Sequence, residues 1–296
     1  MKNIKGFSLI ELSIVILIIG ILVAGVTQSS RLINMMKLQS IRSLTMASPV
    51  SSISNLVLWY EPTLEKSFDS SEAADATEVT TWYDINPQSS SKNNAISIGS
   101  ARPKYKANCL NGLPCLSFDG NDYLDTTQLI GGLRLSIFMV VSGSNIMVGT
   151  CCTALLMSSG AWILGKAHFQ FNGTDIPSST TGVVSYVTND ASTGHYTNRN
   201  GVLANVSYIF SLIDKGNSLT IYINGATGGS GTSVGNLNGV IKTPVTHNIG
   251  SWFDGVTRAR YLTGSVAEII IFDRDLKIDE RQDVEKYLAK KWAIKI

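Results

Sequence analysis

The stretch Lys5–Glu11, which reads KGFSLIE, is followed by an almost purely apolar run that extends to Val26. Glu11 is the one acid near the start of this run, and no further charge occurs until Arg31. About 20 apolar residues are enough for a helix to cross a bilayer. We therefore expect a helix of membrane-spanning length near the start of the sequence.

Glu11 is the residue of this segment that needs a physical explanation. Each Leu, Ile or Val contributes about −0.3 to −0.6 kcal/mol to insertion, whereas a central acid costs about 2.5 to 3.5 kcal/mol. The aliphatic residues from Leu12 to Val26 sum to roughly −3 to −7 kcal/mol, so we expect insertion despite Glu11. A partner cation would remove the remaining cost of the acid. A signal-anchor helix with one acid near a membrane surface is the alternative.

The position of Gly6 differs from that of a secretory cleavage site, which follows the apolar region. Gly6 precedes that region, and Gly6–Glu11 resembles the leader of type IV prepilins and type II secretion pseudopilins. The resemblance implies that a membrane prepilin peptidase cuts after Gly6 and that the new N-terminal Phe7 is methylated. It also implies that Glu11 pairs with the α-amino group of Phe7 of a neighbouring subunit during filament assembly.

Composition excludes some classes of partner. Lys and Arg total 24 and Asp and Glu total 22 among 296 residues, so the basic balance typical of nucleic-acid binding is absent. Only 16% of residues are charged, below the usual quarter or so. This favours an exported, turn-rich β domain, in which the four Cys can form disulfides.

Helical spacing of apolar residues continues from Leu32 to Leu44, and Pro49 should end the helix because the residue before a proline avoids helical geometry. We predict one helix from Phe7 to about Ala47. Gln28 stands near the point where many major pilins carry a proline, which leaves the choice between pilin and pseudopilin open. The predicted organisation is a cleaved leader (1–6), a hydrophobic then amphipathic helix (7–48), a Ser-rich hinge (49–55) and a sandwich domain (56–296).

Strand patterns dominate from position 56 to about position 272. The tail then changes to a helical period, with acids in its first turn and Lys290 and Lys291 in its last, as the helix dipole favours. We predict strands at 56–60, 80–83, 135–141, 168–171, 206–213, 219–223 and 266–272.

The order and spacing of several segments resemble the laminin-G-like, concanavalin A-like superfamily. The predicted fold class is therefore a long N-terminal transmembrane and filament α-helix, then an all-β concanavalin A-like jelly-roll sandwich with a C-terminal capping helix. Lys277 departs from the family, which usually has a capping Ser there. Such folds bind sugars, proteins or calcium and some are hydrolases, so the fold does not define the function. The segments are Leu58–Trp59, Val79–Asp84, Leu116–Leu124, Ile221–Gly225, Gly264–Asp273 and Glu280–Trp292.

The cysteines are predicted to behave differently in the two places where they occur. Cys109 and Cys115 flank a Gly- and Pro-containing turn, so we predict a disulfide there, with free thiols as the alternative. Cys151 and Cys152 are adjacent, and a bridge between neighbours is strained because their Cα atoms lie only about 3.8 Å apart. Their state is left open.

Oxygen-bearing side chains gather after the segment Leu116–Phe118. Asp119, Asn121, Asp122 and Asp125, with Asp84 across a sandwich rim, could supply ligands to calcium. The alternative is that this cluster forms a turn, as Asp and Asn commonly do. No cofactor other than calcium is predicted.

Aromatic residues give a second candidate site, since Trp162, Trp252 and Phe253 could stack a sugar ring. We expect Trp59, Trp82 and Trp292 to be core residues instead.

Glycoside hydrolysis needs two carboxylates that flank one bond. Glu268, Asp273 and Asp275 are the only close acidic set on a predicted strand, and Ile270 stands where the glycosidases of this superfamily carry a central Asp. We therefore predict no enzymatic activity.

These observations predict a pilin-like subunit, a minor one, of a type IV pilus-type filament that displays a binding or adhesion head. The expected partners are other pilin-like subunits, the prepilin peptidase and a glycan or protein ligand. The expected location is the bacterial inner membrane, then a cell-surface or extracellular filament. The alternatives are a periplasmic type II secretion pseudopilin with a subunit-binding head and, less favoured, a membrane-tethered carbohydrate-active enzyme.

Overall fold

This computed structural model describes residues 9–144, 146, 152–171, 182–189, 194–199, 201–226, 234–236 and 241–296. For residues 24–28, 30, 31, 194–199 and 234–236 it describes the backbone without the side chains. The chain divides into two compact units, residues 1–43 and residues 44–296.

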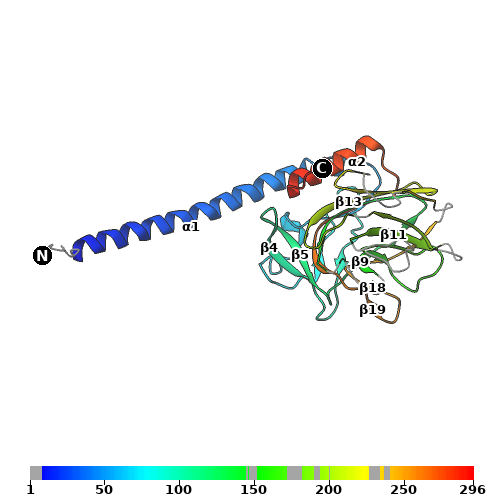
Figure 1. The fold of residues 1–296 in the computed structure, drawn as a ribbon, viewed down its shortest axis with the longest axis horizontal. Helices are drawn as coiled ribbons and strands as arrows, with labels where there is room; N and C mark the ends of the chain where they lie inside the picture. Colours follow the sequence, from blue (N-terminus) through cyan, green and yellow to red (C-terminus); the bar gives the residue numbers. More distant parts are fainter. Residues whose placement is uncertain are drawn as a thin grey trace. The chain divides into compact units, whose positions relative to one another are not determined.

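Helix α1 runs from Leu9 to Met46 without interruption (Figure 1). The prediction of a single long helix is confirmed between these bounds, and Phe7 and Ser8 lie outside the described residues. Every large apolar side chain from Leu9 to Val23 is at least 45% exposed. A surface of this kind is normally covered by other apolar groups.

No helix in the described part of the chain is long and apolar enough to cross a membrane.

Residues 44–296 form the predicted β-sandwich, followed by a C-terminal helix. The described residues give two eight-stranded antiparallel sheets and two short strand pairs, β7 (Ile130–Gly132) with β16 (Lys242–Val245) and β18 (Trp252–Phe253) with β19 (Arg258–Ala259). Sheet A has the order β15 (Val234–Asn236), β14 (Ser218–Ile223), β13 (Ser207–Asp214), β8 (Leu135–Gly143), β20 (Thr263–Phe272), β5 (Leu113–Asp119) and β4 (Lys104–Leu110), and β1 (Leu56–Tyr60) pairs with the second half of β20. Sheet B has the order β12 (Gly194–Arg199), β11 (Val184–Asn189), β10 (Ala167–Phe171), β9 (Thr153–Ser158), β17 (His247–Ile249), β6 (Leu124–Thr126), β3 (Ala95–Ile96) and β2 (Thr81–Trp82).

The two sheets pack face to face. Phe169 and Phe171 of β10 point into the core, where their ring centroids lie 6.3 Å and 5.7 Å from that of Phe210 on β13. Because side chains alternate along a strand, His168 and Gln170 lie on the outer face of sheet B.

All seven predicted strands are confirmed: β1 has the predicted ends, and the ends of the other six differ from the prediction by at most three residues. The sequence patterns do not predict the other strands of the described residues, among them β4, β9, β11 and β12. Strand β4 is at the edge of sheet A and most of its side chains are exposed or half-buried, so it has no apolar alternation.

Two short 3-10 helices are present: η1 (Pro49–Ser51) precedes β1, and η2 (Glu65–Ser67) lies between β1 and β2. Helix α1 ends at Met46, just before Pro49 as predicted, and Pro49 begins η1.

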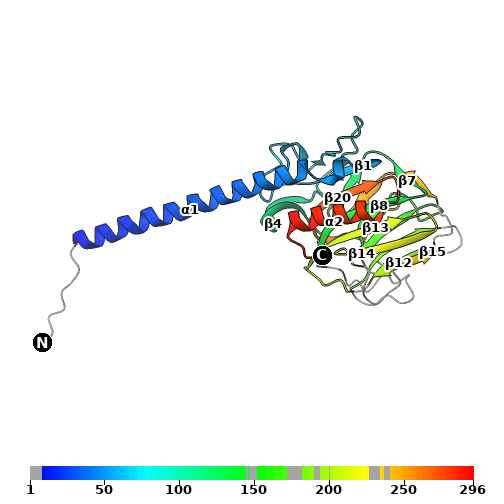
Figure 2. The ribbon, with the colours of Figure 1, turned by 90° about the horizontal axis from the view of Figure 1, so that it is seen from above.

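Helix α2 runs from Ile278 to Trp292 and lies on the outer face of sheet A (Figure 2). At Lys277, where the resembled family has Ser, the carboxylate of Glu280 accepts the backbone N–H at 2.9 Å. Glu280 also pairs with Arg274 at 2.7 Å. Glu280 thus supplies one half of a capping box at the helix start, the bond from the third helical residue back to the N-cap N–H.

Beneath α2, the fully buried Glu268 of β20 accepts three hydrogen bonds from aromatic side chains. The indole N–H of Trp59 and the hydroxyl of Tyr287 each donate to Oε1 at 2.8 Å, and the indole N–H of Trp292 donates to Oε2 at 2.8 Å. These bonds join β1, β20 and α2.

Lys291 adds a buried cation to the same network. Its Nζ lies 2.7 Å from Oε2 of Glu61 and 3.0 Å from Oε2 of Glu268, and all three side chains have 0% exposure. Glu61 also accepts bonds from the backbone N–H of Thr63 at 3.0 Å and the hydroxyl of Ser67 at 2.9 Å. The charged groups are therefore paired and hydrogen-bonded, as buried charges must be.

Candidate functional site

The residues predicted to be processed, Gly6 and Phe7, lie outside the described residues. Glu11 lies in the first turn of α1, where a carboxylate is favoured by the helix dipole. Its pairing with Phe7 of a neighbouring subunit involves a second chain and stays a prediction.

The cluster after β5 forms a turn, which is the alternative predicted for it. Oδ2 of Asp122 accepts the backbone N–H of Asp119 at 2.9 Å, and Oδ1 of Asp119 accepts that of Asn121 at 3.2 Å. Gly120 has a φ of +104°, which a residue with a side chain rarely adopts. Burial and the nearby Asp119 carboxylate raise the pKa of Asp122 to about 6.

Asp84 is only 4% exposed and connects neighbouring segments rather than facing a rim. Its carboxylate accepts the backbone N–H groups of Trp59 and Asn86, each at 2.9 Å, and that of Asn93 at 3.1 Å. Asp84 therefore ties β1 to the loop that follows β2.

Asp125 of β6 forms an ion pair with Arg258 at 2.7 Å and accepts a hydrogen bond from Asn248 at 2.6 Å. The guanidinium of Arg258 lies 3.6 Å from the ring centroid of Tyr123 and 5.0 Å from that of Phe253. Phe253 was predicted to contact a ligand. One face of its ring lies next to Arg258, which is on the paired strand of the same hairpin.

Within the residues described, no group of three or more His, Cys, Asp or Glu is placed to hold a metal ion. The residues predicted for calcium are divided between a turn, a connection between segments and an ion pair. The predicted calcium rim is not assembled, because these carboxylates already accept bonds from local N–H and guanidinium donors.

The hairpin of β18 and β19 places Trp252 against a small apolar cluster of Cys152, Ala154 and Met157. Ala154 and Met157 face outward from β9, because they pair with Gln170 and His168 of β10. The predicted ligand-contacting Trp252 is therefore half-buried on the outer face of sheet B.

The structure adds two residues, His168 and Arg260, to the predicted pair Trp162 and Trp252. The ring of His168 lies between those of Trp162 and Trp252, with centroid distances of 4.3 Å and 5.4 Å. The guanidinium of Arg260 lies 4.3 Å from the Trp252 ring centroid. We call Trp162, His168, Trp252 and Arg260 the outer aromatic cluster.

His168 is neutral at pH 7, because burial, together with the positive charge of Arg260, lowers its pKa well below the usual value. In the sequence, only the alternation His-Phe-Gln-Phe at 168–171 indicates that His168 lies on the outer face of the sheet. No sequence spacing relates His168 to the loop that carries Trp162 or to Arg260.

Two of the acids considered for hydrolysis, Glu268 and Asp275, have partners within the head. Glu268 is fully buried under α2 with both oxygens hydrogen-bonded, and Asp275 forms an ion pair with Arg134 at 3.1 Å.

The predicted Cys109–Cys115 disulfide is present, with the Cα atoms 5.7 Å apart. It closes the hairpin of β4 and β5, whose turn residues Asn111 and Gly112 have φ values of 52° and 66°. Cys152 is buried and disulfide-bonded, and Cys151 lies outside the described residues.

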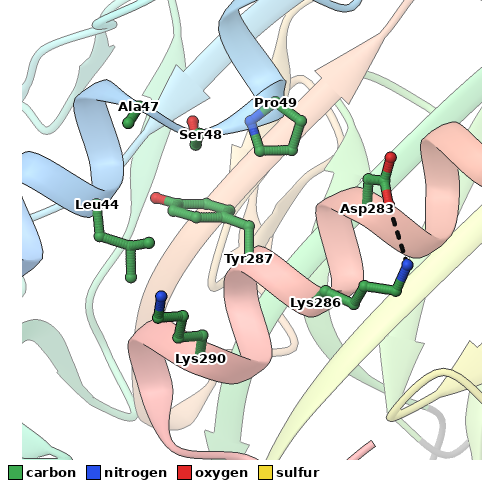
Figure 3. Close-up of a pocket in the computed structure, with 8 residues that line it drawn as sticks. All are labelled: Leu44, Ala47, Ser48, Pro49, Asp283, Lys286, Tyr287 and Lys290. Atoms are coloured by element: carbon green, nitrogen blue, oxygen red, sulfur yellow. Dashed lines mark hydrogen bonds and ion pairs between the residues drawn. The ribbon is translucent and has the colours of Figure 1, made fainter.

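A pocket of ≈ 350 Å³ lies between residues 44–49 and α2 (Figure 3). In this view the Tyr287 ring lies between Leu44 and Pro49, and Lys286 is paired with Asp283 at 3.1 Å. Its lining is Leu44, Ala47, Ser48, Pro49, Asp283, Lys286, Tyr287 and Lys290.

Comparison with known proteins identifies the N-terminus. Residues 1–27 match the prokaryotic N-terminal methylation motif, so the chain carries a prepilin-type N-terminus. A search of the curated proteins gives no match.

Several solved structures are similar to the sandwich. Domain 4 of AbnA, a GH43 extracellular arabinanase from Geobacillus stearothermophilus solved with arabinotriose, has a TM-score of 0.53 and 11% identity over 78% of this chain and 98% of that chain. The binding domain of botulinum neurotoxin serotype G has a TM-score of 0.52 and 11% identity, covering 79% of this chain and 51% of that one. The binding domain of botulinum neurotoxin DC, solved with rat synaptotagmin II, has a TM-score of 0.50 and 11% identity, covering 81% and 52%.

The chain thus spans about half the length of these neurotoxin chains. At such low identity the similarity establishes the β-sandwich fold alone. The motif supports a subunit like a type IV pilin or a pseudopilin, with a membrane-anchored precursor, and the similar structures show that its head has a β-sandwich fold.

Proposed function

We propose that the protein is a minor subunit of a type IV pilus-type filament and that its β-sandwich is a binding or adhesion head on the filament surface. The methylation motif at residues 1–27, continued by the uninterrupted helix Leu9–Met46, carries this proposal. The prepilin peptidase processes the precursor in the inner membrane, and other pilin-like subunits then surround α1.

Assembly follows from the apolar surface of α1. Lipid covers this surface in the precursor, and the helices of neighbouring subunits cover it in the filament. Because lipid and helix surfaces are about equally apolar, the exchange has little hydrophobic driving force of its own. The pairing of Glu11 with the amine of Phe7 supplies a favourable and directional contact, since an acid in apolar surroundings is costly until it is paired.

The similar structures support a head that binds. The arabinanase domain was solved with a saccharide and one neurotoxin domain with a protein, so both ligand classes occur on this fold. No arrangement of acids among the described residues favours hydrolysis.

Mass spectrometry of the mature protein tests the processing on which this proposal depends. We expect an N-terminal peptide that begins at Phe7 and carries one extra methyl group. Material that begins after Val26, or a chain that is never cut, would contradict the proposal.

Glu11→Ala is expected to leave membrane association intact and to reduce incorporation into filaments strongly, because the helix becomes more apolar but loses its pairing group. The measurement compares the subunit in membrane and sheared-filament fractions. Glu65→Ala, which removes an acid from the head, is the control and should incorporate normally. Normal incorporation of Glu11→Ala would count against the assembly mechanism.

A pseudopilin with a subunit-binding head is the second candidate, and in that case the pocket of Figure 3 is where we place the partner subunit. A partner subunit seated there would contact both the residues that end α1 and helix α2. Labelling of the head on intact cells distinguishes the two, because a pilus subunit is reached from outside whereas a periplasmic pseudopilin is not.

A further inference from the structure

Among the described residues, eight buried side-chain polar atoms have no hydrogen-bond partner, and three of them are on the outer face of sheet B. These three are Nε2 of His168, Oγ of Ser185 and Nε1 of Trp252. Ser185 of β11 lies directly opposite Gln170 of β10, so it shares the face of His168. Buried polar groups in folded proteins are nearly always paired, so three unpaired ones on one face indicate a partner that the protein alone does not supply.

The surroundings of these atoms define the chemistry of that partner. Trp162 and Trp252 are half-buried, and each has its ring against the neutral His168. The indole N–H is a donor only, whereas a hydroxyl or a neutral imidazole can donate or accept. Flat apolar rings beside neutral donors and acceptors match a molecule with hydroxyl groups around an apolar ring face.

The backbone at this face is also strained. Arg260, whose side chain lies over Trp252, has a φ of +61°, which non-glycine residues rarely adopt, and its carbonyl accepts the N–H of Ala154 at 2.8 Å. Such strain concentrates at functional sites. In addition, the N–H of Gly160 donates to the carbonyl of Phe253 at 2.8 Å, which joins the loop that carries Trp162 to the β18–β19 hairpin.

We infer that the outer aromatic cluster, together with Ser185, binds a saccharide. One sugar ring packs on Trp162 while its hydroxyls pair with His168, Ser185 and Trp252. Because the Trp162 ring lies on that of His168, the ligand reaches Nε2 of His168 after Trp162 moves off this ring. This inference rests on the proposed binding head and names its ligand class.

The test uses the full-length protein in a zwitterionic detergent that contains no sugar. A glycan array with animal-type glycans and bacterial polysaccharides identifies a binder and its source, and calorimetry then gives the dissociation constant. Trp162→Ala is expected to weaken binding by about tenfold or more, as for an aromatic anchor. Tyr83→Ala, which changes a half-buried aromatic residue elsewhere, is the matched control and should bind as the wild type does.

Ser185→Ala separates binding from structure. It removes a buried hydroxyl without a partner, so the melting temperature should stay the same or rise while saccharide binding weakens. Failure of the wild type to bind any saccharide, or unchanged binding by both Trp162→Ala and Ser185→Ala, would overturn the inference. Both variants should still enter filaments, so loss of binding alone leaves the filament proposal standing.

Discussion

Lys291→Met is expected to lower the free energy of unfolding by about 3 to 5 kcal/mol, as when one partner of a buried ion pair is removed. The substitution keeps most of the side-chain volume but leaves Glu61 and Glu268 without their shared cation, 2.7 Å and 3.0 Å from its former position. Chemical denaturation at neutral pH measures the change. Lys290→Met is the matched control, because Lys290 is the exposed neighbour on the same helix, and it should cost little.

The pH dependence of the two proteins gives an independent check. Burial alone raises the pKa of Glu61, but the charge and hydrogen bond of Lys291, with the bonds from Thr63, outweigh it and hold the pKa below 4.5. A carboxyl whose pKa is lower in the folded state stabilises the fold above its unfolded pKa and loses this effect as the pH falls. Without Lys291, burial dominates and raises the pKa of Glu61, so that ionisation of Glu61 then destabilises the fold. The difference in free energy of unfolding between wild type and Lys291→Met should therefore shrink as the pH falls below about 5. A difference that stays constant would show that Lys291 does not act through the carboxylate of Glu61.

Trp82→Ala is expected to destabilise the head by about 3 to 5 kcal/mol, the range for removal of a buried Trp or Phe. Trp82 has 0% exposure, and its ring stacks on those of Tyr60 and Phe68 at centroid distances of 5.4 Å and 6.1 Å. Its indole N–H donates to the carbonyl of Glu61 at 3.2 Å, so the residue fills space and satisfies a buried acceptor.

Trp82→Phe distinguishes these two contributions. It keeps an aromatic ring in the stack but removes the hydrogen bond, so it should cost clearly less than Trp82→Ala. Thermal and chemical denaturation of both variants give the comparison. An equal loss in the two variants would mean that the hydrogen bond dominates and that the cavity argument is wrong.

The burial of three tryptophans was predictable from the sequence, but the hydrogen bonds that two of them make in the core were not. Trp59, Trp82 and Trp292 are at most 3% exposed, as expected for core residues. Trp59 and Trp292 are nevertheless donors to one carboxylate, Glu268, which the sequence places inside an apolar strand. Periodicity identifies a buried face, but it does not show which polar atoms meet there.

The predicted calcium rim fails for a related reason. Three of the predicted ligands are aspartates with different surroundings. The carboxylates of Asp84 and Asp122 accept different backbone N–H groups, and that of Asp125 pairs with Arg258. A carboxylate that already accepts good local bonds has fewer lone pairs left for a metal. Composition alone does not reveal these local donors.

Local features of the sequence determined the leader motif, the long helix, the hairpin turn with its disulfide, most strands of the core and the final helix. Each depends on residues within a few turns or one hairpin of each other, where backbone preference and side-chain period act directly. The tertiary structure alone decided the Glu61–Lys291–Glu268 network and the outer aromatic cluster. Their members come from segments far apart in the chain, and only the register of the two sheets and the packing of α2 bring their polar atoms within hydrogen-bonding distance.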